Sequence, residues 1–179
     1  MLRHPRQFDT AVSITGVGLI TPLGHSAWAT WRALLDGRCL TDRCANLQAG
    51  TDPVILAQAI GSVSIARHAP VDPAMMLAEH AAAQAIAEAG VNAEGLPTIV
   101  AASKGAVRDR DRYAGGPLSR VADHLHNRLG VTIQGQIVAA CASSLVGLHR
   151  ARQMIRHGEA QRVLVVTSEA AIEPIYVHS

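Results

Sequence analysis

The stretch from Gly135 to Gly158 constrains the fold of this chain most, because its hydrophobic pattern changes period within a few residues. Ile137 and Val138 are apolar and β-branched, as is typical of a strand. From position 145 the pattern recurs at intervals of three and four, which indicates a half-buried helix that Gly158 ends. The residues of this stripe are Leu145, Leu148, Ala151, Arg152 and Ile155. The stretch therefore predicts a strand, a tight turn that holds Cys141, and a helix.

The position of Cys141 has a chemical consequence. The first turn of a helix presents unpaired N–H groups and the positive end of the helix dipole, and both favour a thiolate, which is the nucleophilic form of cysteine. A tight turn also needs small neighbours, and the chain supplies Ala139, Ala140, Ala142, Ser143 and Ser144. A buried cysteine can equally act as a small, inert apolar side chain. The residues alone leave both interpretations open.

Strand and helix patterns alternate along the rest of the chain, which is the order of an α/β layer. Two short strands at 54–59 and 62–66 are weaker predictions, and 106–119 has a loop pattern. The clearer predictions are a strand at 11–20, a turn at 21–24, a helix at 27–35 capped by Ser26, a helix at 74–89 between Pro73 and Gly90, a strand at 97–103, a helix at 121–129 and a buried strand at 162–167.

Three blocks of sequence, in this order, resemble the β-ketoacyl synthases, the condensing enzymes of fatty-acid and polyketide synthesis with the thiolase fold. The first covers 12–18, 21–24 and 31–38, the second covers 140–144 and 155–160, and the third covers 168–172. The resemblance implies an α/β fold, the N-terminal half of a thiolase-like protein, with a mixed sheet and helices packed on its faces. It implies a single domain over residues 1–179.

The resemblance also implies a chemistry. Cys141 would accept an acyl group from a pantetheine thioester on acyl carrier protein, for Claisen condensation with a malonyl unit, without a cofactor or a metal. The backbone N–H of Cys141 would be one oxyanion donor. Thr15, Gly16 and Gly18 would shape the core, and Glu169 would be a structural carboxylate and not a base.

The chain departs from the family because it lacks the histidine motifs that the second half of family members carries. The family carries two histidines there, in motifs of the His-Gly-Thr-Gly-Thr and Asn-Ser-Phe-Gly-Phe-Gly-Gly kinds, and neither motif is present. Acylation of Cys141 needs chiefly a thiolate and oxyanion donors, whereas decarboxylative condensation would need histidines from another chain or segment. The segments at 38–73 and 103–141 also look shorter than in the family.

The nine histidines of the chain are poor substitutes. His149 follows Cys141 on the same predicted helix and lies about 12 Å further along its axis. His124 and His126 are two apart on a helix, so their side chains face different ways. His178 is too close to residue 179 to place. A surface or capping role is the prediction for these side chains.

Three functional hypotheses remain. In the first, the chain is a ketosynthase half that works with a C-terminal-half chain or segment. In the second, it is a non-catalytic subunit, chain-length-factor-like or regulatory, that pairs with a true ketosynthase. In the third, it is a domain of a longer enzyme. A half-fold leaves one helix-packing face uncovered, so we expect a homodimer or a heterodimer. Residues 137–140 are the candidate interface strand. Trp28 and Trp31, three apart on one helix face, are predicted core or interface anchors and not a ligand cage.

Composition narrows the partners. Hydrophobic residues make up 49% of the chain, charged residues 17%, and the mean hydropathy is +0.17, so another protein is expected to cover part of the surface. A net charge of +2 indicates neither nucleic acid nor an anionic membrane. The alternating Arg and Asp at 108–112 predict a solvated loop, with contact to a phosphate-bearing partner as the alternative.

Three cysteines without a disulfide framework suggest a reducing compartment, and Cys39 and Cys44 lack the second ligand pair of a zinc site. No signal peptide or membrane-spanning run is apparent, so the expected location is the cytoplasm.

Overall fold

The computed structural model describes residues 11–38, 71–106 and 116–170. The strands predicted at 54–59 and 62–66, the run at 108–112, Cys39, Cys44 and His178 lie outside the described residues. The elements in chain order are the helices α1 (Ala27–Leu35) and α4 (Pro73–Ala89), strand β1 (Pro97–Ala101), helix α5 (Pro117–Leu129), strand β2 (Thr132–Ile137), the 3₁₀ turn η2 (Ala140–Ala142), helix α6 (Ser143–Arg156) and strand β3 (Leu164–Thr167).

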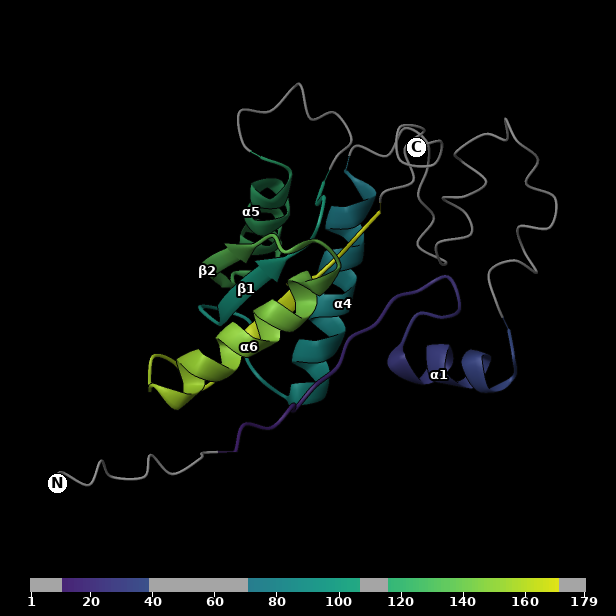
Figure 1. Cartoon of the computed structure of the whole chain (residues 1–179), viewed down its shortest axis with the longest axis horizontal. Coiled ribbons are helices and arrows are strands. Elements are labelled where there is room, and N and C mark those ends of the chain that lie inside the picture. The colour runs from purple at the N-terminus through teal and green to yellow at the C-terminus, as the bar shows by residue number, and fades with distance from the viewer. Residues whose placement is uncertain (1–10, 39–70, 107–115, 171–179) are drawn as a thin grey trace, which may run out of the picture.

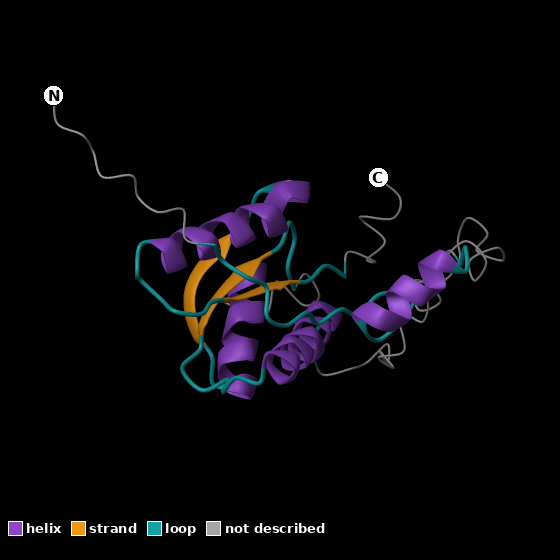
Figure 2. Cartoon of the chain, turned by 90° about the horizontal axis from the view of Figure 1, so that it is seen from below, coloured by secondary structure: helices purple, strands orange, loops and turns teal. Residues whose placement is uncertain are grey.

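The strands form one sheet in the order β2-β1-β3, and both pairs are parallel. Thr98 pairs with Ile133 on one side and Leu164 on the other, so β1 is the central strand. Because parallel neighbours cannot be joined by a hairpin, α5 and α6 serve as crossovers. Helix α6 covers one face of the sheet, and α4 and α5 cover the other, while α1 lies apart (Figures 1 and 2). This α/β architecture confirms the predicted fold class.

The main core lies between the sheet and the pair α4 and α5. Its buried residues include Val100, Val121, Leu125 and Val131, each at most 1% exposed. Ile99, the neighbour of Val100, points to the opposite face and packs with Ala151 and Met154 of α6. This alternation is that of a central strand buried on both faces.

Helix boundaries follow from capping residues. The Ser26 side chain accepts a hydrogen bond from Ala29 N at 3.1 Å, and Asp72 accepts one from Ala74 N at 2.8 Å. Gly90 ends α4 in the left-handed conformation, at φ 62°, as predicted. Helix α5 begins at Pro117, four residues before the predicted start, because proline at the first helical position lacks only an N–H that would be unpaired anyway.

The predicted strand at 11–20 is wrong as a sheet strand. These residues run extended across α4, and they form no ladder with any described strand (Figure 1). Two of their N–H groups bond to α4 side chains instead: Val17 N donates to Glu88 Oε2 at 2.9 Å and Leu19 N to Gln84 Oε1 at 3.2 Å. The turn that follows is confirmed, since Thr21 and Gly24 exchange two backbone hydrogen bonds.

Two predictions of burial also need correction. Of the β3 residues, predicted to be buried, only Val166 is fully so, because β1 covers one edge and no described strand covers the other. Trp28 and Trp31 are 69% and 55% exposed on α1 and belong to no described core. Their other predicted role, as interface anchors, stays a prediction.

Candidate active site

The segment between β2 and α6 forms the turn on which Cys141 was predicted. Cys141 is the middle residue of η2, directly before α6, and it is exposed. The preceding Ala140 has a φ of 48°, the one non-glycine positive φ among the described residues. Left-handed backbone costs an alanine about 1 to 2 kcal/mol, so surrounding contacts must hold this turn.

Ser143 supplies those contacts. Its side chain is 4% exposed, and its Oγ accepts a hydrogen bond from Ala139 N at 2.9 Å and donates one to Ala140 O at 2.8 Å. Ala142 N also donates to Ala139 O at 3.0 Å. The sequence offered Ser143 only as a small neighbour of the cysteine. The signal for its role was a hydroxyl residue at the start of a helix, where it can bond local backbone groups.

The contact face of α6 differs from the predicted stripe. Its buried residues are Ser143, Gly147, Ala151 and Met154, whereas Leu145 and Leu148 are 69% and 46% exposed. The reason is close packing of helix on sheet: a Cβ on Gly147 would lie 3.1 Å from Val165 Cγ1 and 3.4 Å from Ala101 Cβ. Gly147 and Ala151 therefore face the sheet together with Met154, whereas Leu145 and Leu148 stay exposed.

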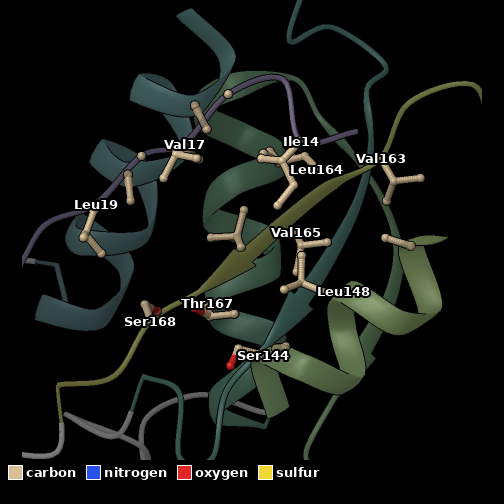
Figure 3. Close-up of a pocket in the computed structure, with 18 of the residues that line it drawn as sticks. Ile14, Val17, Leu19, Ser144, Leu148, Val163, Leu164, Val165, Thr167 and Ser168 are labelled. Atoms are coloured by element: carbon tan, nitrogen blue, oxygen red, sulfur yellow. The ribbon is translucent and has the colours of Figure 1, made fainter. Parts of the chain in front are cut away.

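Cys141 opens into a cavity of about 970 Å³. Ser144 and Leu148 of α6 also line this cavity, which extends along β3 to the extended segment 12–20 (Figure 3). The lining is mostly apolar. The thiol thus lies against a mostly apolar cavity surface.

Glu169 follows the C-terminal end of β3, and its carboxylate bonds to residues that follow the C-terminal end of β1. Its Oε2 accepts hydrogen bonds from Ser103 Oγ at 2.5 Å and from Lys104 N at 3.2 Å, both just after β1. These contacts are those of a structural carboxylate, the role predicted for it. They fix the edge of the sheet next to the Cys141 turn.

The comparisons with known proteins agree with this geometry. The family model described as "Beta-ketoacyl synthase, N-terminal domain" matches residues 9–179. The chain belongs to this family. The family assignment confirms the resemblance carried by the three sequence blocks. No curated protein matches the chain.

Solved structures show that this synthase domain has the thiolase-like fold. A β-ketoacyl synthase from Burkholderia phymatum aligns with a TM-score of 0.55 at 18% identity, over 81% of this chain and 43% of that one. A 3-oxoacyl-(acyl carrier protein) synthase III from Xanthomonas oryzae pv. oryzae aligns with a TM-score of 0.50 at 24% identity, over 89% and 44%. The domain thus spans less than half the length of the synthases that it resembles.

No histidine of the described part of this synthase domain lines the cavity. His149 is exposed on α6. His124 Nε2 bonds Glu79 Oε2 at 2.6 Å between α5 and α4, and His126 Nδ1 bonds Val131 O at 2.8 Å after the end of α5. His126 thus has the predicted capping role, whereas the surface role is wrong for His124, whose side chain is only 10% exposed and links α5 to α4.

Glu79 is the acceptor of an ion-pair cluster far from Cys141. Burial raises the pKa of its carboxyl, but hydrogen bonds from His124 and Arg128, together with their charges, outweigh burial and lower the pKa below its ordinary value. Arg128 Nε lies 3.2 Å from Glu79 Oε1. These ion pairs link α5 to α4.

Within residues 11–38, 71–106 and 116–170, no three histidine, cysteine or acidic side chains gather as metal ligands would. Among the same residues, no helix has the length and apolar character that crossing a membrane requires.

Proposed function

We propose that this domain performs the acyl-transfer step of a ketosynthase, with Cys141 as the nucleophile. The observation that carries the proposal is the placement of an exposed thiol on a braced turn, in front of the α6 N-terminus and at the mouth of an apolar cavity. The substrate would be an acyl group on the pantetheine arm of acyl carrier protein, so no cofactor or metal is needed.

The first step is a thioester exchange. Cys141 Sγ attacks the acyl carbonyl, and the resulting oxyanion accepts a hydrogen bond from the Cys141 N–H, for which no described residue is an acceptor. The intermediate collapses when the bond to the pantetheine sulfur breaks. The acyl group stays on Cys141, and the cysteine proton leaves with the pantetheine thiol.

The second step needs groups that the described cavity lacks. Decarboxylation of a malonyl unit releases carbon dioxide and leaves a carbanion, which attacks the acyl-Cys141 carbonyl and expels the cysteine thiolate. In the family two histidines assist this step. We propose that another chain or segment brings them, and that the domain acts in the cytoplasm as part of a homodimer or a heterodimer. The exposed Val138, Leu145 and Val146 offer an apolar surface for that contact.

A second candidate is a non-catalytic subunit that pairs with a complete ketosynthase. The absence of a histidine from the described cavity favours it. The exposed Cys141 and the strained turn that presents it disfavour it, because a merely structural partner has no need of either.

The intact mass of the protein after incubation with an acyl-pantetheine thioester tests the proposal. We expect one acyl adduct, absent from Cys141→Ala and retained in a Leu35→Ala control, whose side chain is exposed on α1 and lies outside the cavity lining. If the wild-type protein forms no adduct, and Cys141 also resists a small alkylating agent, the acyl-transfer role is wrong and the non-catalytic subunit takes its place.

A further inference from the structure

The carboxyl edge of the sheet brings together residues that lie far apart in the sequence. Strands β2, β1 and β3 are parallel, so the turns that follow them lie at one edge, where parallel α/β sheets commonly bind ligands. Cys141 follows β2, Lys104 follows β1 and Glu169 follows β3, and all three line the same cavity. Because β1 is the central strand, the turn that holds Lys104 lies between the other two turns.

Backbone hydrogen bonds hold the turn of Lys104 at this edge. Lys104 N donates to Glu169 Oε2 at 3.2 Å. Ala102 N donates to Ile137 O at 3.2 Å, which connects the start of this turn to the end of β2, just before the turn of Cys141. The side chain of Lys104 is exposed, and it carries its ammonium group on a flexible stem. The backbone is therefore fixed beside the Cys141 turn while the charge can move within the cavity.

Cations outnumber carboxylates in the cavity lining. Lys104, Arg152 and Arg162 belong to it, and Glu169 is its one acidic residue within the described part of the chain. Arg152 lies in the C-terminal half of α6, and Arg162 precedes β3. Both arginines therefore lie toward the end of the cavity that is remote from the carboxyl edge. Lys104 is the cation that shares the sheet edge of Cys141.

The lining also changes in polarity along β3. Residues with a hydroxyl group lie toward the carboxyl edge, and apolar residues lie toward the other end (Figure 3). The first are Ser144, Thr167 and Ser168, and the second include Ile14, Val163 and Leu164. An acyl group on Cys141 begins at the polar end. Because a charged group is costly to bury without a partner, an ammonium group at this end favours an acyl group that carries a negative charge.

We propose that Lys104 is a specificity-determining residue that selects short acyl groups with a terminal carboxylate, such as a succinyl thioester. The ammonium group of Lys104 pairs with the carboxylate while Cys141 Sγ attacks the thioester carbonyl. The new bond to Cys141 Sγ forms, the bond to the pantetheine sulfur breaks, and the cysteine proton leaves with the pantetheine thiol. Lys104 takes no part in the proton transfer. The inference rests on the proposed function, because it names the acyl group that Cys141 accepts.

A pair of alkylating agents tests the position of the charge without requiring acyl transfer. Iodoacetate and iodoacetamide both alkylate Cys141 with loss of iodide, and they differ chiefly in charge. Peptide mass spectrometry gives the rate constant of each at Cys141. We expect the ratio of iodoacetate to iodoacetamide to fall by about fivefold or more in Lys104→Met and to stay near the wild-type ratio in Lys104→Arg. Arg32→Met removes the same charge from α1, outside the cavity lining, and should leave the ratio unchanged.

A matched pair of thioesters tests the selection itself. Succinyl-pantetheine and butyryl-pantetheine differ in a carboxylate and a methyl group. We expect wild type to prefer the succinyl group by about tenfold and Lys104→Met to lose this preference, while its acylation by the butyryl group is kept. A merely structural role of Lys104 would slow both reactions together.

The outcomes separate this inference from the proposed function. An equal preference in wild type and Lys104→Met, or an unchanged ratio of alkylation rates, overturns the selection by Lys104. If neither thioester acylates Cys141, the proposed acyl transfer is wrong. The ratio of alkylation rates then still decides whether Lys104 selects anions at Cys141.

Discussion

The two faces of the sheet differ in how completely helices and buried side chains cover them. The face under α4 and α5 is closed over a continuous core, and its helices are capped and joined by the Glu79 cluster. The face under α6 has a small core of Ile99, Ala151 and Met154, and Leu145 and Leu148 of its helix stay exposed. Cys141 belongs to this second face, and the cavity extends from it past β3 to α4. Stability should therefore depend on one face and chemistry on the other.

The largest difference should come from matched leucine truncations on the two faces. Leu125→Ala empties a fully buried site between α5 and the sheet, and we expect a loss of about 2 to 5 kcal/mol in the free energy of unfolding. Leu145→Ala removes a side chain that is 69% exposed, and the change should stay within about 0.5 kcal/mol. Urea unfolding measures both. Equal losses would show that α6 is as tightly buried as α5.

The attachment of the segment 11–20 gives the next largest effect. Gly18→Ala forces a Cβ into the backbone of Ala81, and we expect a loss of about 1 to 3 kcal/mol, with faster amide exchange at 11–20. Gly135→Ala in β2 is the control, because the space around that position is open and alanine there should be neutral or slightly stabilising. A neutral Gly18→Ala would mean that the segment does not rest on α4.

The two hydrogen bonds of Ser143 in the Cys141 turn should affect both the stability of the fold and the rate of acylation of Cys141. Ser143→Ala removes the acceptor for Ala139 N and the donor to Ala140 O, at a cost of about 0.5 to 1.5 kcal/mol. Acylation of Cys141 should slow more than this modest loss of stability explains, because the left-handed Ala140 loses its support. Ser26→Ala, which removes the α1 cap at a similar cost and lies outside the cavity lining, serves as the reference. Equal acylation rates in the two variants would remove Ser143 from any positioning role.

The smallest expected effect is the pH dependence of the stability that Glu79 contributes. Because the pKa of Glu79 is lowered in the folded protein, its ion pairs stabilise the fold above its unfolded pKa, and this stability is lost as the pH falls through the folded pKa. Glu79→Gln should cost about 0.2 to 1 kcal/mol near neutral pH and nothing at strongly acid pH. Urea midpoints across the acid range measure this. A constant difference between the variant and wild type would contradict it.

The sequence predicted the elements whose signals are local. Capping and glycine signals located α1 and α4, and the change of period at Cys141 located the turn. It failed where burial depends on distant neighbours. Leu145 and Leu148 look like core residues along the chain, and only the approach of α6 to Val165 shows that Gly147 must face the sheet. The apolar alternation at 11–20 likewise predicts a strand, but a strand also requires a neighbour that the sequence pattern does not reveal.

The parallel arrangement of β2, β1 and β3 also bears on how the chain folds. Every strand pair closes across a helix, as Thr98 does with Ile133 and with Leu164, so no hairpin can form early and seed the sheet. Loop-closure entropy is lost before these contacts compensate for it, which makes such sheets slow to form. We expect refolding to be limited by the arrival of β3 at β1. Until it arrives, the edge of the central strand is exposed to pairing with other chains.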